Sequence, residues 1–486
     1  MASTFVGGSN GENGPVILKL DSSGNVFIAG KTASDNYPIT PGAYNTSSKD
    51  GFISMLDNNL TNLLASTFLG GSFNDYFTSL TFDSSGNVFV GGCTDSSDFP
   101  TTPGAYDTSY GGGDTFPGGD IFISKLNSTL SSLLASTFVG EEENEQINGL
   151  VIDSSGNVYI TGSTDSFNYP VTPGAYDTSY NGSYDVFVSK LDNNLKTLLA
   201  STFIGGSQED RSNAIILDSF GNVLITGQTL AYPGISSYYP TTPGAYDTSI
   251  SGYIDVFVSK LDSNLTNLIS STFIGGGAGG TSESASTISL DSSGNVFIAG
   301  FTENEDFPTT SGAYDNSYNG GTSDIFISKF NDSLTNLLAS TFIGGSDNDS
   351  CLSLVLDFSG NVFITGMTVS TDFPTTPGTY DMSLNGEWDT FVAKLDSNLS
   401  EGEILCGYSI SPISKTFSAN GGSGTVNVYT NSNDCSWTAT SNASWITITS
   451  TSGGTGNGWV VYWVIANTGV SSRTGTMTIA GPSVSM

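Results

Sequence analysis

The stretch Asp21-Ser22-Ser23-Gly24-Asn25-Val26 decides the fold of this chain. Two apolar runs flank each copy of it, as Leu80-Thr81-Phe82 and Val88-Phe89-Val90 flank the second copy. Apolar runs joined by Asp, Gly and Asn are typical of a β-hairpin, because Gly adopts positive φ and Asp and Asn bond back to nearby backbone. An EF-hand calcium loop is disfavoured, because it needs a longer series of alternating ligands and a closing Glu. The pattern Asp-x-x-Gly-Asn-Val recurs at spacings of 62 to 73 residues and begins at Asp21, Asp83, Asp153, Asp218, Asp291 and Asp357.

Two further runs complete each repeat. A third strand is predicted by the pattern Asp-x-Phe-x-Ser-Lys-Leu, as in Asp185-Val186-Phe187-Val188-Ser189-Lys190-Leu191. Four strands in each unit of 62 to 73 residues are typical of a β-propeller blade. The fourth strand is predicted by Ser-Thr-Phe, whose Phe follows the Asp of the third strand by 18 residues, at Phe68, Phe138, Phe203, Phe273 and Phe342.

The ends of the repeat region predict how the propeller closes. The last third strand, at Asp389, has no fourth strand after it, because Gly407 stands where the Phe would fall. A matching run, Ala2-Ser3-Thr4-Phe5, lies at the start of the chain. Since closure removes an exposed sheet edge, we predict that this N-terminal strand pairs with the Phe391 strand of the last blade. The expected fold is all-β, with a six-bladed propeller over residues 1–400.

The connection between the second and third strands varies in length and contains Phe/Tyr-Pro-x-Thr-Pro-Gly-Ala-Tyr. Thr followed by Pro is a helix-start signal, so one short helical turn is predicted in each blade. Variable loops on a rigid scaffold commonly carry function. The final Tyr either packs between blades, which its repetition favours, or joins a sugar platform; the candidates are Tyr106, Tyr176 and Tyr246. The Asp after it is either solvated charge, the favoured interpretation, or a weak Ca²⁺ ligand; the candidates are Asp107, Asp177 and Asp247.

Composition excludes several functions. The chain has 12 Lys and Arg residues against 46 Asp and Glu residues, a net charge of −34 that would repel nucleic acid and anionic membranes. Histidine is absent, which excludes Ser-His-Asp and Cys-His catalysis and every His-based metal site. No apolar run is long enough to insert into a membrane. Apart from weak Ca²⁺, no cofactor is expected.

Lysine and cysteine have predicted structural roles. The third strand carries Lys in five repeats and Met55 in the first, so we expect a structural pair between each Lys and the Asp of the hairpin turn. Cys93 and Cys351 occur where other repeats have no Cys, and we expect unpaired core thiols there. The five lysines are Lys125, Lys190, Lys260, Lys329 and Lys394.

The pattern changes after residue 400. Residues 401–486 hold only 3 acidic and 2 basic residues but four of the five tryptophans. Alternating runs such as Gly424-Thr425-Val426-Asn427-Val428 predict a small β-sandwich. Cys406 and Cys435 flank strand-like residues there, and we predict a disulfide between them, which suits an extracytoplasmic compartment.

The run Trp459-Val460-Val461-Tyr462-Trp463-Val464 alternates like a strand, so Trp459 and Trp463 share one face. Two interpretations stand. The two Trp side chains stack on sugar rings, or they pack in the core or against the propeller, which we favour.

Two resemblances add expectations. The text DSSGNVFIAG, DFPTTPGAYDTSY and DVFVSKLD resembles the SBBP β-propeller repeat family of secreted proteins, over residues 2–396. The segment from Cys406 through Cys435-Ser436-Trp437, Ser444-Trp445-Ile446 and Arg473-Thr474-Gly475 resembles the BACON domain. That resemblance implies an Ig-like sandwich that binds carbohydrate, and it implies that Val460, Tyr462 and Val464 face the core.

These features together predict a secreted or cell-surface binding or adhesion protein that recognises a glycan or a surface protein. No signal peptide is visible, and we expect a segment of a longer protein. A structural scaffold in a larger surface protein is the second hypothesis, and a carboxylate-dependent glycan hydrolase or lyase is the third. The acidic stretch Glu141-Glu142-Glu143-Asn144-Glu145 breaks the repeat, and we interpret it as a solvated loop.

Overall fold

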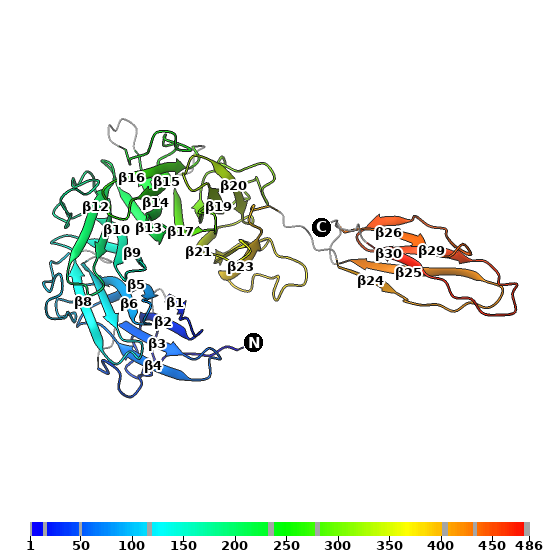
Figure 1. Ribbon diagram of the computed structural model, residues 1–486, viewed down its shortest axis with the longest axis horizontal. Coiled ribbons are helices and arrows are strands. Elements are labelled where there is room, and N and C mark those ends of the chain that lie inside the picture. The colour runs from blue at the N-terminus through cyan, green and yellow to red at the C-terminus, as the bar shows by residue number, and fades with distance from the viewer. Residues whose placement is uncertain are drawn as a thin grey trace. The chain divides into compact units, whose positions relative to one another are not determined.

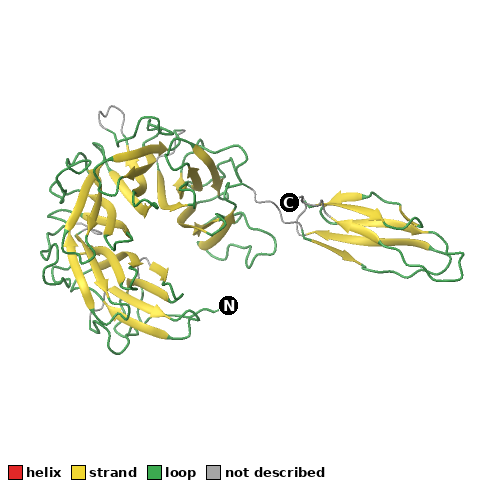
Figure 2. Ribbon diagram, in the orientation of Figure 1, coloured by secondary structure: helices red, strands yellow, loops and turns green. Residues whose placement is uncertain are grey.

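The computed structural model describes residues 2–12, 17–47, 51–113, 119–231, 238–277, 282–400, 407–430 and 435–480. The chain divides into two compact units, one formed by Met1–Phe373 with Leu384–Ser400 and the other by Pro374–Ser383 with Glu401–Met486. The regular elements within the described ranges are strands, as Figure 2 shows. No helix long and apolar enough to cross a bilayer occurs in that part of the chain.

The first unit consists of five four-stranded sheets and one three-stranded sheet, each antiparallel and in chain order. The sheets are β1 (Ile17–Leu20), β2 (Val26–Lys31), β3 (Gly51–Leu56) and β4 (Leu63–Phe68); β5 (Asp75–Phe82), β6 (Val88–Thr94), β7 (Asp120–Leu126) and β8 (Leu133–Val139); β9 (Glu145–Ile152), β10 (Val158–Thr164), β11 (Asp185–Leu191) and β12 (Leu198–Ile204); β13 (Asp210–Leu217), β14 (Val223–Leu230), β15 (Ile254–Leu261) and β16 (Leu268–Ile274); β17 (Glu283–Leu290), β18 (Val296–Thr302), β19 (Asp324–Phe330) and β20 (Leu337–Ile343); and β21 (Asp349–Leu356), β22 (Val362–Thr368) and β23 (Asp389–Leu395).

The repeated hairpin turn forms as predicted. The Oδ1 atom of Asp21 accepts hydrogen bonds from the backbone N–H groups of Ser23 and Asn25, both at 2.8 Å. The Asn25 side chain donates to Oδ2 of the same Asp at 2.8 Å, and Gly24 has a φ of 81°. The motif therefore fixes the register of β1 against β2, in which Leu20 faces Val26.

Successive sheets pack face to face around their first strands, which lie on the inner side of the arc in Figure 1. One residue of each third strand packs in a common core with one residue of the next sheet's first strand. Ile123 of β7 and Leu150 of β9 show this contact and are 0% and 6% exposed. The equivalent pairs are Ile53 with Leu80, Val188 with Ile215, Val258 with Ile288, and Ile327 with Leu354.

The Thr-Pro-Gly-Ala motif forms a β-turn, so the predicted helical turn is wrong. The backbone N–H of Ala43 donates to the Thr40 carbonyl at 3.2 Å, and Gly42 has a φ of 83°. Pro at the second position and a positive-φ Gly at the third are the requirements of a type II turn. The Gly after Pro therefore decides between turn and helix.

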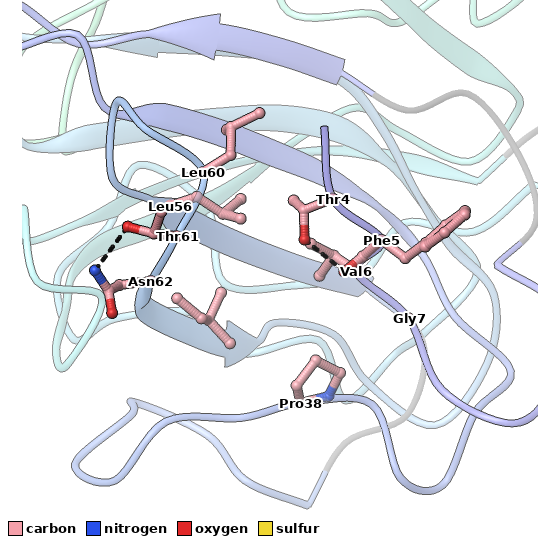
Figure 3. Close-up of a pocket in the computed structure, with 10 residues that line it drawn as sticks. Thr4, Phe5, Val6, Gly7, Pro38, Leu56, Leu60, Thr61 and Asn62 are labelled. Atoms are coloured by element: carbon pink, nitrogen blue, oxygen red, sulfur yellow. Dashed lines mark hydrogen bonds between the residues drawn. The ribbon is translucent and has the colours of Figure 1, made fainter. Parts of the chain in front are cut away.

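The N-terminal run is not paired with β23 in this structure. Residues 2–8 have no strand assignment, and among the described strands β23 is an outer strand of a three-stranded sheet. Thr4–Gly7 instead line a hollow of about 210 Å³ beside Leu56, Leu60 and Leu63, as Figure 3 shows. The six sheets are propeller-like blades, and ring closure is not seen.

The second unit contains two sheets. One has the order β24 (Tyr408–Ser411), β25 (Gly422–Thr430), β29 (Gly458–Val464) and β27 (Ile446–Ile448). The other has the order β28 (Gly453–Thr455), β26 (Ser436–Ser441) and β30 (Met477–Ala480). Val428, Trp437, Ala439 and Val460 form a buried cluster that joins strands of both sheets. This is the packing of a small β-sandwich.

Candidate functional site

The outer face of β25 and β29 carries two exposed tryptophans. The side chains of Trp459 and Trp463 are 63% and 49% exposed, whereas Val460, Tyr462 and Val464 between and after them are 0%, 6% and 7% exposed. The alternation of β29 produces this division, because successive side chains point to opposite faces of a sheet. Val460, Tyr462 and Val464 face the core, as the BACON resemblance implies, and the two Trp side chains lie on the solvent side, so the interpretation that they pack in the core is wrong.

Polar side chains flank both tryptophans. In the sheet register Trp459 pairs with Asn427, and Trp463 pairs with Ser423 on one side and Thr447 on the other. Asn427, Ser423 and Thr447 are exposed. Tyr429, two residues beyond Asn427 on the same face of β25, is 47% exposed. We call Trp459, Trp463 and Tyr429 with these polar neighbours the aromatic face.

The aromatic face has the features of an interaction surface. Alternate residues of a strand lie about 7 Å apart, so Trp459 and Trp463, four residues apart, lie roughly 13 Å apart along β29. Val461 lies between them on the same face and is half-buried. Indole rings offer large apolar surfaces with specific contact geometry, and exposed aromatic groups rimmed by polar groups mark interaction surfaces.

The tyrosines of the propeller loops are half-buried between sheets. Tyr106 packs against the core that the second and third sheets share, and its backbone N–H donates to the Leu195 carbonyl of the third sheet at 2.8 Å. Tyr176 and Tyr246 make the same backbone bond to Leu265 and Leu334, at 2.8 and 2.9 Å. Burial raises the pKa of all three phenols. These contacts favour the packing interpretation over the sugar platform.

The loop aspartates stabilise local turns. Oδ1 of Asp107, Asp177 and Asp247 accepts the backbone N–H of the Ser two residues later, each at 2.8 Å. Within the described ranges, no group of three or more His, Cys, Asp or Glu side chains is placed to hold a metal ion. A role of these three residues as Ca²⁺ ligands stays a prediction.

The lysine of the third strand pairs with the hairpin Asp of its own sheet. The Lys125 Nζ to Asp83 Oδ2 distance is 3.0 Å, and the Lys260 to Asp218 distance is also 3.0 Å. Lys125 reaches across to the next sheet as well, where Oδ1 of Asn193 accepts its hydrogen bond at 2.5 Å. The predicted structural pair is present for Lys125, Lys190, Lys260 and Lys329, and Lys125 also ties neighbouring sheets together.

The structure contradicts part of the interpretation of the acidic stretch and agrees with the expectation of free core cysteines. Glu142 and Glu143 are exposed, but Glu145 is the first residue of β9 and is 0% exposed, so the solvated-loop interpretation is wrong for Glu145. Cys93 and Cys351 are free and buried, as expected. Cys435 is buried and disulfide-bonded, but Cys406 lies outside the described residues, so the Cys406–Cys435 pairing stays a prediction.

A set of buried carboxylates escaped the sequence reasoning. The first residue of β5, β9, β13, β17 and β21 is an Asp or Glu that is at most 1% exposed, and so is the Asp near the start of β7, β11, β15 and β19. The sequence did show that these acidic residues recur at strand starts. Acidic residues there usually belong to a solvated loop end, so their burial was not expected. The two sets are Asp75, Glu145, Asp210, Glu283 and Asp349, and Asp120, Asp185, Asp255 and Asp324.

Comparisons with known proteins agree with this architecture. A family model described as the viral BACON domain matches residues 407–485, and the SBBP β-propeller repeat model matches residues 66–100 and 145–170. No curated protein matches the chain.

Similar solved structures are distant. An ulvan lyase, described as a polysaccharide lyase, is 10% identical with a TM-score of 0.40, over 95% of this chain and 95% of its own. A protein of unknown function from Dyadobacter fermentans is 10% identical with a TM-score of 0.40, over 76% and 94% of the two chains. One from Bacteroides caccae is 9% identical with a TM-score of 0.34, over 72% and 87%. Scores this low carry no argument about function. The family matches, with the blades and the sandwich described above, identify a chain with SBBP β-propeller repeats in its N-terminal region and a BACON domain at its C-terminal end.

Proposed function

We propose that this protein binds carbohydrate through the aromatic face of its BACON domain, and that the propeller serves as the rigid body that carries this domain. The observation that supports the proposal is the exposure of Trp459 and Trp463 on one face of β29. A folded domain gains no stability from leaving two indole rings in water, so their position favours contact with a ligand.

The polar neighbours fit the same ligand class. Ser423, Thr425, Asn427 and Thr447 offer hydroxyl and amide groups beside the indole rings. Sugar rings present both apolar C–H faces and hydroxyl groups, so a surface with aromatic centres and a neutral polar rim matches them. The C-terminal residues 401–486 hold only 3 acidic residues, so this surface also tolerates anionic glycans better than the propeller does.

A glycan array with the intact chain and with Trp variants tests the proposal. Trp459→Ala and Trp463→Ala should each weaken binding to any glycan that the intact chain retains, by roughly tenfold or more, since losses of about 1–3 kcal/mol are typical when a ring that stacks on a ligand is removed. Trp388→Ala is the matched control, because Trp388 is 56% exposed and lies outside the C-terminal segment. A large drop in melting temperature in the two variants, or equal loss in the control, would contradict the proposal.

We favour this binding role over the alternative of a carboxylate-dependent hydrolase or lyase in the propeller. Its carboxyls with raised pKa values recur from sheet to sheet and are buried, which is the behaviour of a scaffold. We further propose that the protein acts outside the cytoplasm, secreted or on a surface, because a disulfide-bonded Cys435 suits an oxidising compartment. A surface protein that displays glycans is the partner that fits both points.

We also propose that the six sheets close into a ring. Leu18 of β1 is 60% exposed, whereas its equivalents Leu80, Leu150 and Leu354 are 2%, 6% and 4% exposed. Val392 of β23 is 77% exposed, whereas its equivalents Ile123, Val188 and Val258 are all 0% exposed. Leu18 and Val392 are the two halves of the one inter-sheet contact that would close the ring.

A further inference from the structure

Pairs of carboxylates converge where the fourth strand of one sheet leads into the first strand of the next. A Cβ atom placed on Gly205 would lie 2.8 Å from Oδ1 of Asp185 and 2.9 Å from Oδ2 of Asp210. Asp185 opens β11 in the third sheet and Asp210 opens β13 in the fourth. The two side chains are 0% and 1% exposed, so two carboxylates from adjacent sheets meet in the interior.

The same arrangement recurs at the next two junctions. A Cβ atom on Gly275 would clash with Oε2 of Glu283 and would lie 2.8 Å from Oδ1 of Asp255. A Cβ atom on Gly344 would clash with Oδ1 of Asp324 and would lie 2.9 Å from Oδ2 of Asp349. We call these three arrangements the carboxylate cradles; each is defined by its pair, Asp185 with Asp210, Asp255 with Glu283, and Asp324 with Asp349.

Every carboxylate cradle holds at least one buried oxygen without a hydrogen-bond donor. These atoms are Oδ1 of Asp185 and of Asp210 in the first cradle, Oε2 of Glu283 in the second, and Oδ1 of Asp324 and of Asp349 in the third. Oδ1 of Asp185, Oε2 of Glu283 and Oδ1 of Asp324 each lie near the same glycine as an oxygen of the partner carboxylate, so the two carboxylates of a cradle approach each other beside that glycine. An unpaired buried carboxylate is costly unless a cation or a proton neutralises it.

No basic side chain is among the main electrostatic partners of these carboxyls. The charged groups with the largest effects on their pKa values are all carboxylates, including Asp177 beside Asp185 and Asp315 beside Asp324. The lysines of the third strands pair instead with the hairpin aspartates. Desolvation raises the pKa of Asp185 and Asp324 to about 7 and that of Glu283 to about 8, as expected where a buried carboxylate has no positive charge beside it.

We propose that each carboxylate cradle binds one divalent cation, with Ca²⁺ as the ion that suits it, and that the ions clamp adjacent sheets of the propeller. Ca²⁺ prefers six to eight oxygen ligands from carboxylates, backbone carbonyls and side-chain amides or waters. Each cradle supplies two carboxylates, which match the charge of one such ion.

Neutral oxygens for the remaining ligands lie close by. A Cβ on Gly182 would lie 2.9 Å from the Gly206 carbonyl oxygen and 3.1 Å from Oδ1 of Asp185, and a Cβ on Gly252 would lie 2.9 Å from the Gly276 carbonyl oxygen. Because each cradle contains two carboxylates and not three, the proposal is consistent with the lack of groups of three acidic side chains in the described ranges. Glycine at these positions leaves the approach to the carboxylates open.

Calcium titration of the full chain tests the proposal. After removal of divalent ions with EDTA at pH 8, calorimetry or native mass spectrometry should count at least three bound Ca²⁺, and Ca²⁺ should raise the melting temperature. The variant Asp185→Asn/Glu283→Gln/Asp324→Asn should lose these sites and the thermal shift. The matched control, Asp177→Asn/Asp247→Asn/Asp315→Asn, removes the loop aspartate next to each cradle. It should keep the Ca²⁺ sites and the thermal shift.

Two outcomes would overturn the proposal. If the control loses Ca²⁺ as completely as the cradle variant, the loop aspartates bind the ion. If the intact chain binds no Ca²⁺, each pair is neutralised by a proton instead. Should the triple variant fold poorly, Asp324→Asn alone must remove one bound ion from the native mass spectrum, and an unchanged ion count would equally reject the cradles.

Discussion

At the scale of single residues, the buried carboxyls make stability depend on pH. Their ordinary pKa is near 4, and burial raises the pKa of Asp185 and Asp324 to about 7 and of Glu283 to about 8. At pH values between the ordinary and the raised pKa, the folded chain holds protons that the unfolded chain releases. The neutral forms of these carboxyls therefore contribute stability that is fully present below pH 4 and is lost as the pH rises through 7 to 8.

The free energy of unfolding should therefore fall as the pH rises. Without divalent ions, the free energy of unfolding should drop by a few kcal/mol between about pH 5 and pH 8.5, because one pKa unit corresponds to about 1.4 kcal/mol. Urea unfolding at a series of pH values in EDTA measures this drop in the free energy of unfolding. The variant Asp185→Asn/Glu283→Gln/Asp324→Asn should have a flatter profile than Asp177→Asn/Asp247→Asn/Asp315→Asn. Parallel profiles would assign the pH dependence to the general negative charge of the chain.

At the scale of the hairpin, the turn Asp accepts backbone hydrogen bonds and also pairs with a Lys. The first repeat has only the hydrogen bonds, so it separates the two roles. Oδ1 of Asp83 accepts the N–H groups of Ser85 and Asn87 at 2.9 Å, and its Oδ2 pairs with Lys125 at 3.0 Å. Asp21 makes the same turn, but Met55 replaces the lysine. The first sheet therefore carries the turn without the ion pair.

Replacing the turn Asp should therefore cost less stability in the first sheet than in the second. Asp21→Ala should lower the free energy of unfolding by about 1–2 kcal/mol through lost turn bonds. Asp83→Ala should cost about 3–5 kcal/mol, because it leaves the Lys125 ammonium, 7% exposed, without its carboxylate. Adding Lys125→Met, which copies the first sheet, should recover part of that loss. Urea unfolding measures each value, and equal losses for the two Asp variants would show that the ion pair contributes nothing.

The sequence predicted the elements whose cause is local. Gly and Asn at fixed positions after Asp21 determine the hairpin, and alternation places Trp459 and Trp463 on one face of β29, whereas only the BACON resemblance implied that this face is the exposed one. The type II turn was missed because Thr-Pro begins both a helix and such a turn, and only the φ of Gly42 separates them. Glu145 was missed because an acidic residue at a strand start is usually solvated, and its burial comes from the neighbouring sheet, which no local pattern reports.

At the scale of the whole propeller, successive sheets make contacts that are absent, within the described ranges, between the sixth sheet and the first. The loop Tyr of each of the first five repeats donates its backbone N–H to a positive-φ Leu of the next sheet, as Tyr44 does to Leu130 at 2.9 Å. Tyr380 of the sixth repeat is 96% exposed, and Leu60 of the first repeat is only half-buried. In a closed ring Val392 would cover Leu18, and the sixth repeat would complete its contacts with the first.

Closure in solution makes these exposed residues sensitive to substitution. Leu18→Ser and Val392→Ser should each lower the free energy of unfolding by about 1–3 kcal/mol, because each removes apolar surface that the closed ring buries. Deletion of residues 1–8 should do the same and promote association, because the edge of β23 then lacks its strand. Leu64→Ser is the control: Leu64 is 45% exposed and its equivalents Leu134 and Leu199 are 48% and 45% exposed, so closure covers none of them. If Leu18→Ser and Val392→Ser melt like Leu64→Ser and the truncated chain stays monomeric, the propeller is open.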